Sequence, residues 1–206
     1  RDSYFATILE IQQVNVPFEQ VDATDTDANP YNILSYEAVS TGDATVLDYF
    51  DVDASNGGLI SIRSQWLYPD DTRTLFEYGV ILRDNGGLVS AATATVTVSV
   101  IRNTAPRFTG EPYTNSIPES AAGDSIAFTP TVRDDDTRDP FNVLRYRILG
   151  DDNAPAFFQV NPNTGVVTVV PGSSLLTDIA TSYRIRLEVA DGGTPSLRDT
   201  TVITIN

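Results

Sequence analysis

The chain has 206 residues and a net charge of −15, with 28 acidic and 13 basic residues and neither histidine nor cysteine. This balance argues against nucleic acid and anionic lipid as partners, because both require clustered Lys or Arg. Without histidine the chain lacks the most common general base and zinc ligand, so we do not expect an enzyme. An acidic surface instead suits cations, above all calcium.

Alternation of apolar and polar residues dominates the chain and predicts β-strands. Clear examples, in chain order, are residues 76–82, 93–100 and 184–189. Turn signals rich in Asn, Asp and Gly lie between such segments, at residues 56–58, 85–87, 163–165 and 191–193. Short strands with turns every ten or so residues predict an all-β fold of antiparallel β-sandwiches.

The sequence repeats itself with a period of about 110 residues. Pro30, Asn32 and Tyr36 follow one acidic turn, and a Pro, an Asn and a Tyr follow a second acidic turn 110 residues later. A period this long indicates two copies of one domain of about 100 residues. We place the domains at residues 1–102 and 103–206 and expect two tandem Greek-key β-sandwiches of about seven strands each.

Acidic residues recur at four places in each copy. The first copy carries Glu10, Asp25 with Asp27, Asp70 with Asp71, and Asp84; the second carries Glu119, Asp134 with Asp136, Asp178, and Asp191. A single Asp at a turn could serve only the turn, and a single Glu could simply face solvent. Repetition of the whole set favours metal ligation, because calcium takes six to eight oxygen ligands, mostly carboxylates and carbonyls.

This order of elements resembles the extracellular cadherin repeat, and the resemblance covers the whole chain as two tandem repeats. The A-x-D-x-D element of that family is matched by residues 23–27. Its F-x-[IV]-[DN]-x-x-[TN]-G turn is matched by residues 158–165, and its later Asp-Gly-Pro element by residues 190–195. The resemblance, to the cadherin/protocadherin superfamily, implies a calcium-binding adhesion protein at the cell surface.

By this resemblance, carboxylates gather where successive repeats meet and bind up to three calcium ions. The ligands implied for the internal junction are Glu10, Asp70, Asp71, Asn103, Asp134, Asp136 and Asp191. The upstream junction would use Asp25, Asp27 and Asp84, and the downstream junction Glu119 and Asp178. Two carboxylates ~4 Å apart repel by ~4 kcal/mol at an effective dielectric of ~20, so calcium would stiffen a hinge that is otherwise loose.

The linker departs from the family pattern. Residues 100–104 read Val-Ile-Arg-Asn-Thr where the family has Asp-x-Asn-Asp-Asn, so both acids are missing and Arg102 is present. We therefore predict a calcium-poor internal junction, with one ion or none, that is flexible or bent. Arg102 either substitutes for a cation by pairing with Glu10, Asp134 or Asp136, or is a solvated residue at the end of a strand.

The expected function is that of spacer repeats in a calcium-dependent adhesion protein. Expected partners are other repeats of the same chain and a homophilic or heterophilic cadherin. The location expected is the extracellular part of a single-pass membrane protein, without direct membrane contact by these residues. The alternative is a β-sandwich module that binds a carbohydrate or protein ligand without junction calcium. An exposed aromatic cluster on a sheet face would favour that alternative.

Overall fold

The computed structural model describes residues 3–29, 31–63, 71–150, 156–177 and 180–206. The chain divides into two compact units, Arg1–Arg102 (unit 1) and Asn103–Asn206 (unit 2). Each unit has its own hydrophobic core. Both consist mainly of β-strands, with short 3₁₀ helices such as η1 (Ala44–Asp48) and η3 (Leu175–Thr177). The prediction of an all-β fold is confirmed.

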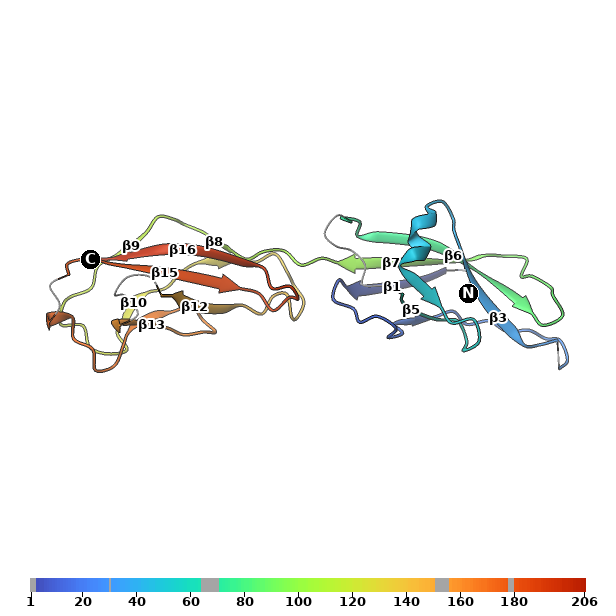
Figure 1. Cartoon of the computed structure of the whole chain (residues 1–206), viewed down its shortest axis with the longest axis horizontal. Helices are drawn as coiled ribbons and strands as arrows, with labels where there is room; N and C mark the ends of the chain where they lie inside the picture. Colours follow the sequence, from blue (N-terminus) through green and yellow to red (C-terminus); the bar gives the residue numbers. More distant parts are fainter. Residues whose placement is uncertain (1–2, 30, 64–70, 151–155, 178–179) are drawn as a thin grey trace. The chain divides into compact units, whose positions relative to one another are not determined.

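Unit 1 contains two sheets that share one core (Figure 1). The larger sheet has the order β1 (Ser3–Leu9), β7 (Ala94–Ile101), β6 (Leu75–Asp84), β3 (Leu34–Val39). The smaller has the order β2 (Glu19–Gln20), β5 (Leu59–Ile62), β4 (Phe50–Val52). β1 is parallel to β7, and the other pairs are antiparallel. Neighbours in the sheets are therefore not always neighbours in sequence, as expected of a Greek-key sandwich.

The alternation seen in the sequence decides which side chains enter the core of unit 1. Val96, Val98 and Val100 of β7 are buried, while the threonine and serine between them are only partly covered. Aromatic rings fill the centre: the ring centroid of Phe50 lies 5.6 Å from those of both Tyr78 and Phe76. Full burial of each such side chain stabilises the fold by about 1.5–3 kcal/mol, so this core is a main source of the stability of unit 1.

Unit 2 repeats the same plan (Figure 1). Its larger sheet has the order β12 (Arg145–Leu149), β15 (Tyr183–Ala190), β16 (Arg198–Ile205), β9 (Tyr113–Asn115), with β9 parallel to β16. A second sheet has the order β10 (Ile126–Phe128), β14 (Val167–Val169), β13 (Phe158–Val160), and β8 (Arg107–Phe108) pairs with β11 (Val132–Arg133). Ile185, Leu187 and Val189 of β15 point into the core.

The two units differ in how many strands their described residues form. Unit 1 has the seven strands expected, whereas unit 2 has nine, because two extended segments are each split into short pieces. Between β8 and β9 lie Gly110, with φ of 90°, and Pro112, which has no amide hydrogen to donate. Both residues interrupt regular strand pairing. The extra pair β8–β11 brings the start of unit 2 next to its first acidic turn.

Candidate metal sites

The first candidate site is an acidic cluster in unit 1, formed by Asp25, Asp27 and Asp84. Asp25 and Asp27 lie in the loop between β2 and β3, and Asp84 is the last residue of β6. One carboxylate oxygen from each residue lies within 4.8 Å of the other two. The structure thus brings together three acids that the sequence separates by up to 59 positions, as the resemblance implied.

Backbone hydrogen bonds hold these carboxylates in place without neutralising them. The backbone N–H of Asp27 donates to Asp25 Oδ1 at 2.8 Å, and that of Leu88 donates to Asp84 Oδ1 at 2.7 Å. Among the residues that the structure describes, no arginine forms an ion pair with the cluster; the nearby Arg83 pairs with Glu37 instead. Three close, uncompensated carboxylates are a donor set that suits a hard cation such as calcium.

The second candidate site is a polar set in unit 2, formed by Asn103, Thr104, Asp134, Asp136 and Asp191. The Asn103 side chain donates to Asp191 Oδ2 at 2.9 Å. The backbone N–H and the hydroxyl of Thr104 both donate to Asp136 Oδ2 at 2.9 Å. The backbone N–H of Asp136 in turn donates to Asp134 Oδ1 at 2.9 Å. The start of unit 2, the loop after β11 and the turn after β15 are therefore linked through these carboxylates.

Two oxygens of the polar set are buried without any hydrogen-bond donor among the described residues. They are Asp134 Oδ2 and the amide oxygen of Asn103. Burial raises the pKa of Asp134, and the charges of Asp136 and Asp191 raise it further. A buried acceptor without a donor typically costs about 1–3 kcal/mol. A cation would satisfy both oxygens, so the residues present fit the calcium ion that the resemblance implies.

The acids expected at the far end of the first copy have a different environment. Arg102 is mostly covered, with 18% of its side chain exposed, and its Nη1 lies 3.8 Å from Glu10 Oε2. Its Nη2 donates to the backbone oxygens of Asp71 and Arg73 at 2.7 and 2.6 Å. The alternative in which Arg102 is solvated is therefore wrong. Its guanidinium lies beside Glu10, and its role as a substitute for a cation stays a prediction.

A second arginine, Arg73, forms a hydrogen-bonded ion pair with the carboxylate of Asp71. Its Nε and Nη2 donate to the two carboxylate oxygens of Asp71 at 3.0 and 2.6 Å, and its Nη1 pairs with Asp43. The guanidinium also lies 5.4 Å from the ring centroid of Tyr49 and 5.0 Å from that of Phe76. Arg73 holds the pKa of Asp71 well below its usual range, and Asp71 raises the pKa of Arg73.

We call Glu10, Asp43, Asp71, Arg73 and Arg102 the arginine network. Sequence reasoning missed Arg73 and Asp43 as members. The spacing Asp-Thr-Arg at residues 71–73 was a local signal for the first pair. The contact with Asp43, 30 positions away, has no local signal. Glu10 and Asp71 each lie beside an arginine, and their assignment as calcium ligands stays a prediction.

Three residues proposed from the sequence remain to be placed. Asp70 and Asp178 lie outside the described residues. Glu119 is exposed in the turn that follows β9. Their assignment as calcium ligands therefore stays a prediction.

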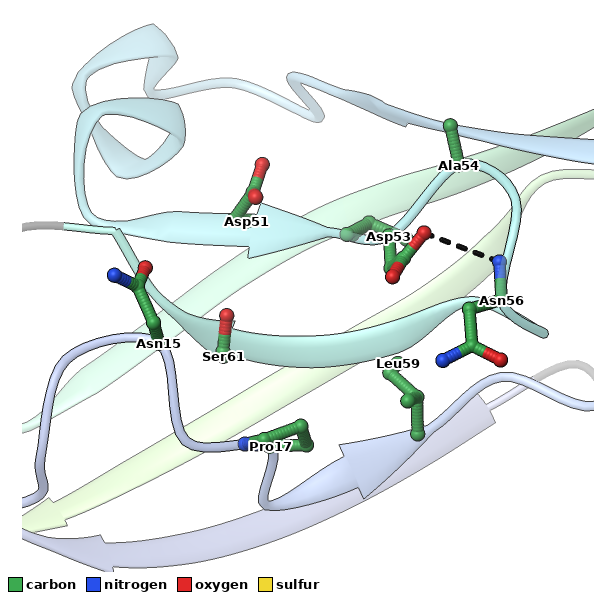
Figure 2. A pocket seen from close by; sticks show the side chains of 9 residues that line it. Asn15, Pro17, Asp51, Asp53, Ala54, Asn56, Leu59 and Ser61 are labelled. Carbon is green, nitrogen blue, oxygen red and sulfur yellow. Dashed lines mark hydrogen bonds between the residues drawn. The ribbon is translucent and has the colours of Figure 1, made fainter.

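An open pocket of about 540 Å³ lies beside β4 and β5 (Figure 2). Its acids are already engaged: the Asp53 carboxylate accepts the backbone N–H groups of Ser55 and Asn56, and Asp51 pairs with Arg63 at 2.9 Å. No aromatic side chain is among the residues that line it. The pocket therefore offers no stacking platform for a sugar ring.

An exposed aromatic cluster is also missing from the described parts of both units. The large aromatic side chains that are exposed there are Phe5, on β1, and Tyr31, in the loop before β3. They come from different elements and do not make a common surface on one sheet. The feature that would have favoured the ligand-binding alternative is therefore not found among the residues that the structure describes.

Comparison with known proteins identifies the architecture. Residues 113–206 match the family model of the cadherin domain. Over 98% of its length the chain is 30% identical to the protocadherin-like wing polarity protein stan of Drosophila melanogaster. It is also 30% identical, over 82% of its length, to mouse protocadherin-16. This chain belongs to the cadherin family.

Solved cadherin structures share the fold. Mouse protocadherin-24 EC1-3 superimposes with a TM-score of 0.53, at 20% identity, over 100% of this chain and 68% of that one. The protocadherin gammaB7 EC3-6 cis-dimer structure gives a TM-score of 0.51, at 21% identity, over 100% of this chain and 50% of that one. These likenesses confirm the prediction of tandem β-sandwiches.

The chain corresponds to a small part of its curated relatives. It spans 6% of the stan protein and 5% of mouse protocadherin-16. Within the described residues, no helix has the length and apolarity needed to cross a membrane.

Proposed function

We propose that this cadherin chain is a pair of repeats, residues 1–102 and 103–206, that serve as calcium-tuned spacers in the extracellular part of a cell-surface adhesion protein. The observation that carries the proposal is the pair of buried oxygens without donors in the polar set, on Asp134 and Asn103. They lie among carboxylates that accept hydrogen bonds from the first two residues of unit 2. A calcium ion held there would couple the start of the repeat to its acidic turns.

Calcium would not be distributed evenly along the chain. One ion would bind the acidic cluster through Asp25, Asp27 and Asp84, and one would bind the polar set. Glu10 and Asp71 would contribute little, because Arg102 and Arg73 already neutralise them. Glu119 and Asp178 remain proposed ligands for a following repeat. The internal junction would then hold fewer than three ions and be flexible or bent.

The partners that fit this role are other repeats of the same protein and a homophilic or heterophilic cadherin. Family membership and the protocadherin relatives support this choice. One similar solved structure is described as a cis-dimer of a protocadherin, which is a property of that protein.

Calcium titration by calorimetry tests the metal sites. We expect the wild-type chain to bind about two ions with Kd of about 10⁻⁴–10⁻³ M, as extracellular modules do. Asp191→Ala and Asp25→Ala should each remove one ion. Asp135→Asn is the matched control, because Asp135 lies between two proposed ligands yet is exposed and pairs with Arg133. Unchanged binding in both ligand variants, or loss in the control, would contradict the assignment.

Small-angle scattering tests the flexible junction. We expect the distribution of interatomic distances to stay broad in millimolar calcium and to change little when calcium is chelated. A chain that becomes rigid in calcium and collapses on chelation would show that the junction is calcium-filled, against the proposal.

A further inference from the structure

The outer face of the larger sheet of unit 2 is strongly basic. Successive residues of a strand point to opposite faces, so every second residue of β12, β15 and β16 shares the face that points away from the core. The arginines on this face are Arg145, Arg147, Arg184, Arg186 and Arg198, and all five are exposed. We call this surface the arginine face.

Strand register places these arginines on adjacent strands. Arg147 of β12 is opposite Glu188 of β15, and Ala190 of β15 lies between Arg145 of β12 and Arg198 of β16. Along each strand, arginines two positions apart are separated by about 6.6 Å, and neighbouring strands lie about 4.8 Å apart. The backbone positions of these arginines therefore form a regular two-dimensional array on the surface of the sheet rather than a pocket.

Glu188 is the single acid among the described residues of this face. Its carboxylate accepts two hydrogen bonds from Arg147, at 2.6 and 3.1 Å, and lies 3.8 Å from Arg198. Arg145 and Arg184 have no ion pair with any acid in the described parts of the chain. The described residues of this face comprise five arginines and one glutamate, an excess of four positive charges within the part of the face that the structure describes, on a chain whose net charge is −15.

The corresponding face of unit 1 has the opposite character. The outward charged residues of β3 and β6 are Glu37, Glu77 and Arg83, and two of these pair with each other. The basic face is therefore a property of the second copy alone and does not follow from the fold. Five of the thirteen basic residues of the chain are concentrated there.

The chemistry of the face favours an anionic polysaccharide over an acidic protein. Protein interfaces have an apolar core from which charged residues are depleted, whereas Leu149 and Val202 are the large apolar residues on this face. Arginine binds sulfate and carboxylate groups through two parallel hydrogen bonds. The hydroxyl groups of Thr114, Thr200 and Thr204 lie on the same face and suit sugar hydroxyls.

We propose that the arginine face of unit 2 binds a sulfated polysaccharide along its strands, in addition to the adhesive role proposed above. The overall negative charge does not prevent this, because charges farther away than about 8 Å are largely screened at physiological salt. Binding needs neither calcium nor the metal sites.

Surface plasmon resonance on immobilised heparin tests this proposal with the whole 206-residue chain. The test variant is Arg145→Ser with Arg184→Ser, since neither residue supports an ion pair within the described structure. The matched control is Arg63→Ser with Arg133→Ser, which removes the same charge from two exposed ion pairs elsewhere. We expect wild-type binding that weakens with salt, about a tenfold loss in the test variant, and little change in the control.

Four outcomes would overturn the proposal. The first three are no binding of the wild type to heparin, equal losses in the two double variants, and a binding response that disappears on calcium chelation. The fourth is self-association, detected by analytical ultracentrifugation, that the test variant abolishes; the face would then serve a second copy of the chain. Failure of the calcium titration described above would leave the heparin result unaffected, so the two proposals can fail separately.

Discussion

The acidic cluster and the arginine network of unit 1 use the same residue types in opposite electrostatic states. Asp25, Asp27 and Asp84 bring their oxygens within 4.8 Å of one another and, in the described structure, have no arginine partner. Asp71 instead receives a two-point interaction from Arg73, and Glu10 faces Arg102. The carboxylates of the acidic cluster repel one another unless a cation binds between them, whereas the arginine network supplies its positive charge from its own side chains.

The difference separates two ways of stabilising the end of a β-sandwich. A metal site makes stability depend on the calcium concentration, since binding to the folded state alone lowers its free energy. A guanidinium group of the protein itself stabilises the carboxylates equally at every calcium concentration. We therefore expect variants of the two sites to respond oppositely to calcium and to acid.

Arg73→Ala should give the largest effect. It leaves Asp71, whose side chain is only 14% exposed, without its cation, and it removes the contacts with Asp43 and two aromatic rings. We expect the free energy of unfolding of unit 1 to fall by about 3 kcal/mol in EDTA, measured by hydrogen exchange of β6 amides. Arg63→Ala, which breaks an exposed ion pair, should cost about 0.5 kcal/mol. Equal losses in the two variants would show that Arg73 stabilises unit 1 no more than an arginine in an exposed ion pair does.

Asp71→Asn should lower the free energy of unfolding of unit 1 by about 2 kcal/mol at pH 7 and by much less in acid. Arg73 keeps the pKa of Asp71 below its unfolded value of about 3.9. The stabilisation is therefore present above about pH 4 and is lost as the pH falls from there towards the folded pKa. Urea unfolding of wild type and variant at pH 7 and at about pH 2.5 measures the two differences. A difference that does not shrink in acid would contradict the assigned cause.

Arg102→Ala should lower the free energy of unfolding of unit 1 by about 1 kcal/mol in EDTA. It should also make the stability of this site depend more strongly on calcium. It frees the Glu10 carboxylate and the backbone oxygen of Asp71, which are ligands of the type that calcium prefers. Millimolar calcium should therefore restore part of the lost thermal stability, beyond the gain seen in wild type. Arg83→Ala, at an exposed pair with Glu37, is the control and should show no extra calcium response.

Asp84→Asn should give the smallest change in the free energy of unfolding, and in EDTA this change should be a gain. An asparagine keeps an oxygen to accept the Leu88 N–H but removes one negative charge from the cluster. In EDTA we expect unit 1 to gain about 0.5 kcal/mol, and in calcium we expect it to lose most of its calcium-dependent stabilisation. Glu77→Gln, an exposed residue of the same strand, should do neither. A destabilised variant in EDTA would mean that the three acids do not repel each other.

Much of the fold followed from local sequence patterns. The valines of β7 and the alternating Ile185, Leu187 and Val189 of β15 are buried as their period of two required. Periodicity works here because a strand has only two faces, and one of them enters the core. The nine strands that the described residues of unit 2 form were not foreseen, since Gly110 and Pro112 interrupt pairing in ways that depend on the neighbouring segment.

The candidate sites were foreseen only in part. Asp25, Asp27 and Asp84 converge as the family resemblance implied, and Asn103 contacts Asp191. The partners of Arg73 and the outward arrangement of Arg145 and Arg198 were missed. A contact between residues 30 or more positions apart has no local signal in the sequence. The sequence predicts that these arginines are polar residues of strands, but which charged residues lie beside them is set only when the strands pair in the sheet.

By itself, the amino-acid sequence determined that this protein contains two copies of one β-rich domain and that acids occupy matching turns in both. Both features depend on spacing along the chain, which the sequence states directly. Only the tertiary structure decided which acids face an arginine, which face each other, and which sheet face collects positive charge. Electrostatic energy depends on distances of a few ångströms between residues from separate strands, and folding sets those distances.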